Sequence, residues 1–134
     1  MRSLALVAHH ERATAREHAQ QAEHWCAEHG IEFWMPPGDA AALDLVHVGS
    51  ARPIAEADLV LSLGGDGTML RSVRLLEGAA VALRGVNLGS LGYLTEVEPD
   101  DLADTLAKFA AGAAEGGWPL AERMMLDITV NGER

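Results

Sequence analysis

The sequence lacks three features that mark common classes of protein. It contains a single cysteine, Cys26, so no disulfide can form within the chain, which indicates a reducing compartment. No stretch approaches the ~18 apolar residues of a membrane-spanning helix. The apolar run near the amino terminus, residues 4–8, is also too short for the core of a signal peptide. Together these absences predict a cytoplasmic protein without a membrane partner.

An excess of basic residues is also missing. The 134 residues include 10 Lys and Arg against 20 Asp and Glu, which gives a formal net charge of −10. This balance argues against a nucleic-acid or anionic-membrane surface as the main partner. It does not exclude a phosphate ligand, because a site built from backbone N–H groups needs few cationic side chains. The length suits one domain with a hydrophobic core and is too short for two complete domains.

The sequence does contain an alternation of short apolar runs and helical patterns. The runs that predict buried strands cover residues 4–8, 31–35, 58–63 and 79–86, and the helical patterns cover residues 11–29, 68–77 and 99–111. Residues 38–57 are less regular, and we expect a short strand there around Leu45 to Val48. The alternation predicts an α/β fold with a parallel sheet and helices on its faces. Ligands of such sheets bind at the carboxyl ends of the strands, where two glycine-containing loops are expected.

The clearest motif is LSLGGDGTML, Leu61 to Leu70, in which three glycines surround one carboxylate. A Walker A loop needs a lysine directly after its last glycine, and the only lysine in this chain is Lys108. A dinucleotide-binding GxGxxG pattern that began at Gly65 would need glycine where Leu70 stands. Six histidines do not pair at the i, i+4 spacing of two metal ligands on one helix face, so we expect no metal site built from histidines.

A strand, this loop and a helix in succession favour a site for phosphate. Gly65 and Gly67 allow unusual backbone conformations and the close approach of a ligand, and Thr68 is placed to cap the helix. The helix start supplies unpaired N–H groups and a positive dipole end. Asp66 alone would repel phosphate, so it needs a hydroxyl or a metal ion opposite it. Phosphoryl transfer to an alcohol with Mg²⁺ meets both needs, whereas the alternative is a simple turn in which Asp66 caps the helix.

Two motifs together resemble those of a known family. GGDGTMLRS, residues 64–72, and GVNLGSLGYLTEV, residues 85–97, resemble the bacterial NAD kinases, and ERMML at 122–126 resembles that family's crossing into its carboxyl-terminal domain. The diacylglycerol and sphingosine kinases and the phosphofructokinases share a loop like the first motif but not the second. The resemblance covers nearly all of the chain and implies a Rossmann-like, phosphofructokinase-like amino-terminal domain.

The resemblance also implies an activity. The family transfers the γ-phosphate of ATP to the 2′-hydroxyl of the adenosine ribose of NAD, giving NADP, and some members accept polyphosphate as the donor. Mg²⁺ or another divalent cation would be the cofactor. NAD and ATP would be the partners, and the full-length protein would form a homo-oligomer, either a dimer or a tetramer.

The resemblance implies roles for residues of both loops. Asp66 stands in the place of the catalytic aspartate, Gly67 lies beside the nicotinamide side of the ligand, and Leu70 lines the same pocket. Tyr93 replaces a phenylalanine that packs against NAD and keeps an aromatic face. Asn87 belongs to the second loop, together with Gly89.

Other residues are candidates from their position alone. Gly65 and Thr68 would contribute to the phosphate site of the first loop. Arg71 follows that motif on the helix and either reaches phosphate or lies in solvent. His9 and His10 end the first strand on the ligand side of the sheet, and are further candidates for a phosphate contact.

The last residues indicate that the chain stops inside a hairpin. MLDITV, residues 125–130, has one apolar face, and Asn131-Gly132 after it is a strong signal for a two-residue turn. We therefore expect an α/β domain at residues 1–118 and the start of a truncated β-rich domain at 119–134. The family's Asn-Glu pair, which grips the ribose, would lie beyond residue 134, so the chain is expected to be inactive alone.

Two other functions remain open. One is a kinase with the same glycine loop that acts on a lipid or a sugar, although the second motif speaks against it. The other is a non-catalytic nucleotide-binding or regulatory domain.

Overall fold

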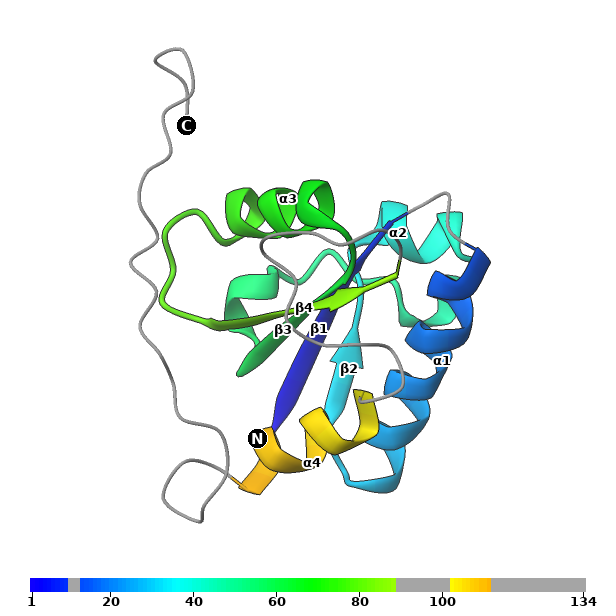
Figure 1. The fold of residues 1–134 in the computed structure, drawn as a ribbon, viewed down its shortest axis with the longest axis vertical. Helices are drawn as coiled ribbons and strands as arrows, with labels where there is room; N and C mark the ends of the chain where they lie inside the picture. Colours follow the sequence, from blue (N-terminus) through cyan, green and yellow to red (C-terminus); the bar gives the residue numbers. More distant parts are fainter. Residues whose placement is uncertain (10–12, 89–101, 112–134) are drawn as a thin grey trace.

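A parallel sheet forms the centre of the fold (Figure 1). The computed structural model describes residues 1–9, 13–88 and 102–111. Within these residues, four strands lie in the order β2-β1-β3-β4, and all neighbouring pairs are parallel. The strands are β1 (Ser3–Ala8), β2 (Glu32–Trp34), β3 (Leu59–Gly64) and β4 (Ala82–Asn87). This arrangement confirms the α/β fold with a parallel sheet.

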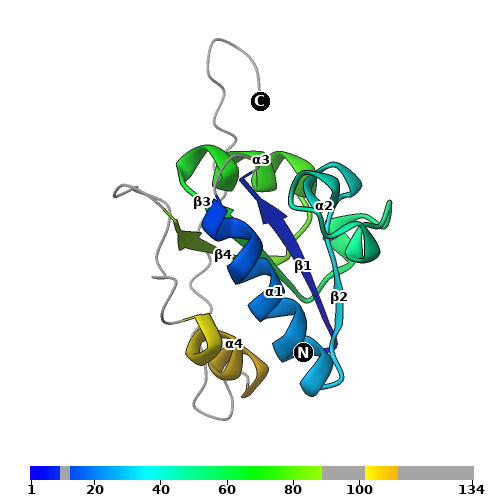
Figure 2. The same cartoon turned by 90° about the vertical axis from the view of Figure 1, so that its right-hand side faces the viewer.

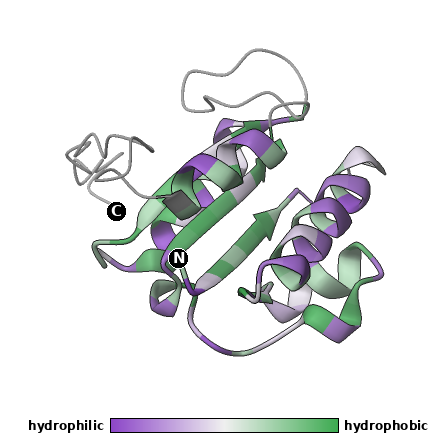
Figure 3. Ribbon diagram, turned by 90° about the horizontal axis from the view of Figure 1, so that it is seen from below, coloured by the Kyte–Doolittle hydropathy of each residue, from purple (hydrophilic) through white to green (hydrophobic). Residues whose placement is uncertain are grey.

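Different helices cover the two faces of the sheet (Figure 2). On one face, α1 (Ala13–Glu28) and α4 (Leu102–Ala111) pack on the larger hydrophobic cluster. On the other face, α3 (Asp66–Leu76) and the 3-10 helix η2 (Ile54–Glu56) pack on the smaller cluster through Leu76 and Ile54. Figure 3 shows that the strands between these helices are predominantly apolar, whereas the helices carry both polar and apolar residues. The sheet is therefore buried on both sides, as its apolar runs predict.

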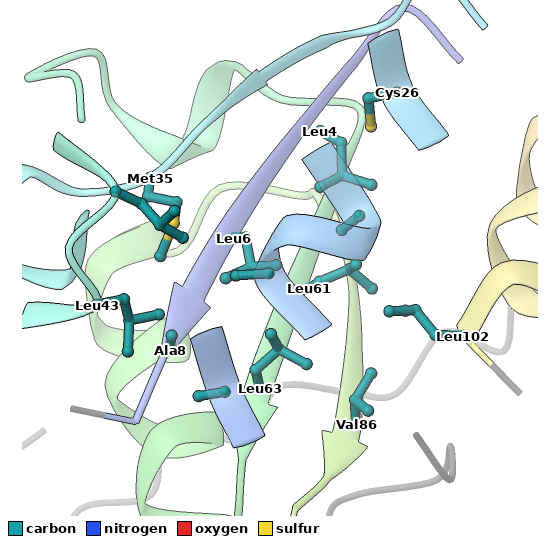
Figure 4. Close-up of a cluster of buried hydrophobic side chains, with 14 of the residues drawn as sticks. Leu4, Leu6, Ala8, Cys26, Met35, Leu43, Leu61, Leu63, Val86 and Leu102 are labelled. Atoms are coloured by element: carbon teal, nitrogen blue, oxygen red, sulfur yellow. The ribbon is translucent and has the colours of Figure 1, made fainter. Parts of the chain in front are cut away.

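Small side chains bring α1 close to the sheet. Its buried stripe is fully inaccessible and consists of Ala15, Ala19, Ala22 and Cys26. Leucine side chains of β1 and β3 point toward this stripe, as Figure 4 shows for Leu4 and Leu61. The helix stops before Gly30, whose φ of +67° is a conformation that glycine adopts easily. The helix predicted over residues 11–29 is confirmed, because α1 covers Ala13–Glu28.

The irregular segment 38–57 differs from the prediction. The expected strand around Leu45 to Val48 is wrong, because residues Val46–Val48 form the 3-10 helix η1. Before it lies a short helix that the sequence pattern did not predict, α2 (Pro37–Ala42), which begins with proline near its first position. Asp44 then turns the chain with a φ of 58°, and only the bridge between Met35 and Gly49 extends the sheet at this edge.

The start of the third helix also needs correction. The sequence places it at Thr68 with that residue as the cap, but α3 begins at Asp66 and its N-cap is Gly65. The first helical hydrogen bond runs from the Met69 N–H to the Gly65 carbonyl at 3.1 Å. Strand β3 therefore passes into α3 with almost no loop, and Asp66 and Gly67 belong to the first helical turn.

Candidate active site

The glycine motif lies at the switch point of the sheet. The chain passes from β1 outward to β2 on one side and later returns to β3 on the other side of β1. The carboxyl ends of β1 and β3 are therefore neighbours, and the His9 N–H donates to the Leu63 carbonyl at 2.9 Å. In open α/β sheets, ligands bind in the crevice at such a point. The position of the GGDGT loop thus matches the general location of binding sites in this architecture.

The three glycines of the motif serve different purposes. A Cβ atom on Gly64 would lie 2.4 Å from the Thr68 hydroxyl oxygen and 3.1 Å from the His9 Cβ, so close packing requires glycine there. For Gly65 and Gly67, no atom of the described residues lies within 4 Å of such a Cβ. Neither of these two glycines has a positive φ. The described part of the fold therefore requires glycine at 64 but not at 65 or 67, where the missing side chain leaves space among the described residues.

Asp66 is the first residue of α3 and is partly buried. The N–H groups of the first turn of any helix lack partners within that helix and carry partial positive charge. These groups, together with the open space at Gly65 and Gly67, form a surface suited to an anion such as phosphate. Asp66 places one carboxylate at the edge of this surface.

The second motif begins beside the first. Asn87 ends β4 and pairs in register with Gly64 of β3. The following residue, Leu88, donates its N–H to the Gly64 carbonyl at 3.0 Å. The sheet therefore brings Asn87 next to the glycine loop, although 23 positions separate the two residues. Tyr93 and Gly89 of the same motif lie outside the described residues.

The other candidates occupy distinct environments. Thr68 is buried beneath Gly64, so its side chain packs inside the fold. Leu70 is 38% exposed on α3 and is accessible to a ligand. His9 lies against Gly64 at the switch point, and His10 lies outside the described residues.

Arg71 forms contacts within the fold. Its Nη1 atom donates to Asp39 Oδ1 at 2.9 Å, and its Nη2 atom donates to Asp39 Oδ2 at 3.2 Å and to the Ala8 carbonyl at 2.7 Å. The side chain is still 38% exposed. The sequence offered a phosphate contact or a solvated side chain for Arg71, and it did not reveal these bonds to Asp39 and Ala8. A phosphate contact for Arg71 stays a prediction.

Asp39 is the residue that sequence reasoning missed. It lies in the first turn of α2, is 2% exposed, and also accepts the Ala8 N–H at 2.9 Å. Its only sequence signal was a carboxylate directly after Pro36-Pro37-Gly38, which is a plausible helix start.

The comparisons with known proteins agree with this geometry. Residues 4–114 match the family model described as the ATP-NAD kinase N-terminal domain. The chain belongs to this family. It is 37% identical over 131 residues to an NAD kinase of Moorella thermoacetica, covering 97% of this chain and 41% of that protein. Against an NAD kinase of Heliobacterium modesticaldum it is 35% identical over 130 residues, with 95% of this chain and 44% of that protein covered.

The match extends across this chain but not across its relatives. An NAD kinase of Nitratidesulfovibrio vulgaris strain DP4 is 34% identical over 163 residues, which include 100% of this chain and 53% of that protein. The chain thus spans roughly half the length of these NAD kinase relatives. Among its described helices, none combines the length and the apolar character needed to cross a bilayer.

Proposed function

We propose that this domain carries the catalytic aspartate of an NAD kinase, which phosphorylates the 2′-hydroxyl of the adenosine ribose of NAD to give NADP. The observation that carries the proposal is the position of Asp66. It opens α3 at the switch point of the sheet, between two glycines that the described fold does not itself require. The relatives are NAD kinases, and NAD is therefore the proposed acceptor of the phosphate.

The chemistry follows from this arrangement. The helix start and the open space at Gly65 and Gly67 hold the phosphates of the donor, which is ATP in this proposal. Asp66 accepts or orients the proton of the attacking hydroxyl. Because the transition state of phosphoryl transfer is loose, correct placement of the hydroxyl matters more than strong deprotonation. A partly buried carboxylate on a rigid helix end suits that task.

A divalent cation fits the site only as a partner of the nucleotide. Within the part of the chain that the structure describes, no group of three or more His, Cys, Asp or Glu residues could hold a metal ion. Mg²⁺ in kinases is commonly held by one or two carboxylates together with substrate phosphates and water. Asp66 is the carboxylate placed to contribute. When bound, the ion neutralises negative charge on the phosphates.

The remaining proposals concern the whole protein. The β-rich domain expected to begin at residues 119–134 lies outside the described residues. Because the chain spans roughly half the length of its NAD kinase relatives, we propose that residues 1–134 alone do not form NADP. Tyr93 and Asn87 contact the dinucleotide, and Gly65, Gly67, Thr68 and Leu70 contribute to the nucleotide site. Arg71 supports this site through its bonds to Asp39 and Ala8. The assembled enzyme is a cytoplasmic homo-oligomer, and polyphosphate serves as a second donor.

Acceptor competition tests the proposed function. The gene product that contains this sequence is incubated with ATP and Mg²⁺, and NAD, fructose 6-phosphate and diacylglycerol are offered separately. We expect phosphate transfer to NAD alone, with NADP detected by an NADP-specific dehydrogenase. Transfer to the sugar or the lipid in preference to NAD would contradict the proposal. Replacing ATP with polyphosphate in the same assay decides the second donor.

A further inference from the structure

Strand β1 continues after its neighbour β2 has ended. Trp34, the last residue of β2, pairs with Ala5 of β1, whereas β1 runs on to Ala8. On its other side, β1 stays paired with β3 as far as the Ala8–Leu63 pair. The N–H and C=O groups of Ala8 that face away from β3 therefore need partners, because buried backbone polar groups are nearly always hydrogen-bonded.

Two side chains from different helices supply these partners. Asp39 of α2 accepts the Ala8 N–H at 2.9 Å, and Arg71 of α3 donates to the Ala8 carbonyl at 2.7 Å. Asp39 and Arg71 also pair with each other through two hydrogen bonds, of 2.9 and 3.2 Å. We call this set, Ala8, Asp39 and Arg71, the β1 clamp. It takes the place of a strand beside the last residue of β1.

Stability alone does not explain a charged pair at this place. Asp39 is 2% exposed, and removing a carboxylate from water carries a large free-energy cost that its partner must offset. Replacing buried ion pairs by apolar residues of similar volume is often neutral or stabilising. The forked geometry of Arg71, by contrast, fixes both distance and orientation between three elements.

The elements that the clamp joins are those of the candidate site. Arg71 lies in the second turn of α3, and Asp66 opens the first turn of the same helix. Ala8 precedes His9, which packs against Gly64. A rotation of α3 about its axis would therefore move Asp66 and break the clamp together, because a helix transmits such motion along its length.

We propose that the β1 clamp positions Asp66, so that Asp39 and Arg71 are positioning residues for phosphoryl transfer. This inference rests on the proposed function. The clamp holds the second turn of α3 against the carboxyl end of β1. The helix carries this constraint to Asp66 in its first turn, where the acceptor hydroxyl must bind. Asp39 touches no substrate and acts through Arg71 and the backbone of Ala8.

The test uses the gene product that contains this sequence, with Asp39→Asn, Arg71→Gln, the double variant and Arg71→Lys. Each of the first two variants should lower kcat by between about 10-fold and 100-fold, since a displacement of 1 Å costs about 10²-fold. KM for NAD and for ATP should change by less than about twofold. The clamp aligns Asp66 for the reaction and does not contribute to the binding of either substrate in the ground state. The double variant should lower kcat no further than the less active of the two single variants does. Such non-additivity is expected of residues that act as a unit. Arg71→Lys should recover part of kcat, because lysine keeps the charge but not the fork.

The control is Arg52→Gln, which breaks the ion pairs of Arg52 with Glu32 and Glu56 on the outer edge of β2. It should leave kcat unchanged. An unchanged kcat in Asp39→Asn, with only lower stability, would show that the clamp is structural and would overturn the inference. A raised KM for ATP with unchanged kcat in Arg71→Gln would show direct binding, and would also overturn it.

A failure of the proposed function gives a different result. If the wild-type gene product forms no NADP, the proposed function fails, and hydrogen exchange then decides the clamp. The Met69 and Leu70 amides lie in the first turns of α3. They should exchange faster in Asp39→Asn than in wild type and in Arg52→Gln. Equal exchange rates in all three proteins would refute the positioning of α3 by the clamp.

Discussion

The substitution Gly67→Ala should separate the needs of the fold from those of the site. It should stabilise the folded protein and lower its activity. Gly67 is in the first turn of α3, has no positive φ, and has no atom of the described residues within 4 Å of an added Cβ. Alanine in a helix is favoured over glycine by about 0.5 to 1 kcal/mol. Gly67→Ala should therefore raise the free energy of unfolding of the 134-residue chain by up to about 1 kcal/mol.

Gly64→Ala provides the opposite case within the same motif. Its new Cβ would lie 2.4 Å from the Thr68 Oγ1 atom and 2.9 Å from the Thr68 Cβ, and Thr68 is only 5% exposed. Extra volume at a well-packed site typically costs about 1 to 3 kcal/mol. Chemical unfolding in urea, followed by circular dichroism, should therefore show opposite shifts in midpoint for the two variants.

Activity completes the comparison. In the gene product, Gly67→Ala should lower the rate of NADP formation by about 10-fold or more, because the methyl group occupies the space offered to the ligand. A loss of stability above about 1 kcal/mol in Gly67→Ala would show that the fold does need this glycine. Unchanged activity would show that the ligand does not use the open space. Either result would refute the distinction between the glycines of this motif.

Two further predictions concern buried groups of the core. Burial raises the pKa of the Cys26 thiol to about 12, so the thiol should resist alkylation in the native chain and react on unfolding. Because the folded pKa lies above the unfolded value, this contribution to stability is complete below about pH 8.5 and falls as the pH rises toward 12, by about 1.4 kcal/mol per pH unit. Urea midpoints from pH 8 to 10.5 should show a steeper decline for wild type than for Cys26→Ala, and equal slopes would contradict the prediction. The Ser62 hydroxyl is buried with no partner among the described residues, so Ser62→Ala should raise the free energy of unfolding by about 1 kcal/mol. A loss of similar size would instead reveal a hydrogen bond to this hydroxyl.

Local patterns predicted most of the architecture. Apolar runs located all four strands of the described sheet to within a few residues, because a parallel strand buried on both faces leaves little choice of side chain. The helical pattern over residues 11–29 located α1 equally well, since the helical period of apolar residues is a local property. The placement of the glycine loop at the carboxyl end of a strand followed from its position in the alternation of strands and helices, whereas the switch point became visible only with the strand order.

Contacts between distant segments could not be predicted in this way. Threonine is a common helix cap, and the sequence therefore suggested that the helix begins at Thr68. Instead, Thr68 is the third residue of α3, and its side chain packs beneath Gly64. Asp39 and Arg71 are 32 positions apart, and nothing local links them. Their partnership depends on β2 ending before β1, which leaves the backbone of Ala8 open to side chains. Tertiary topology, rather than propensity, created that site.

The most direct measurement of the central claim compares two aspartates in the first turns of two helices. Asp66→Asn in the gene product removes the carboxylate at the switch point, and Asp104→Asn removes the exposed carboxylate in the first turn of α4, which pairs with Lys108. With NAD, ATP and Mg²⁺, Asp66→Asn should lower kcat by about 10² to 10⁴-fold at nearly unchanged KM, as expected for loss of a general base. Asp104→Asn should retain full activity. NADP formation by Asp66→Asn at the wild-type rate would contradict the assignment of this site.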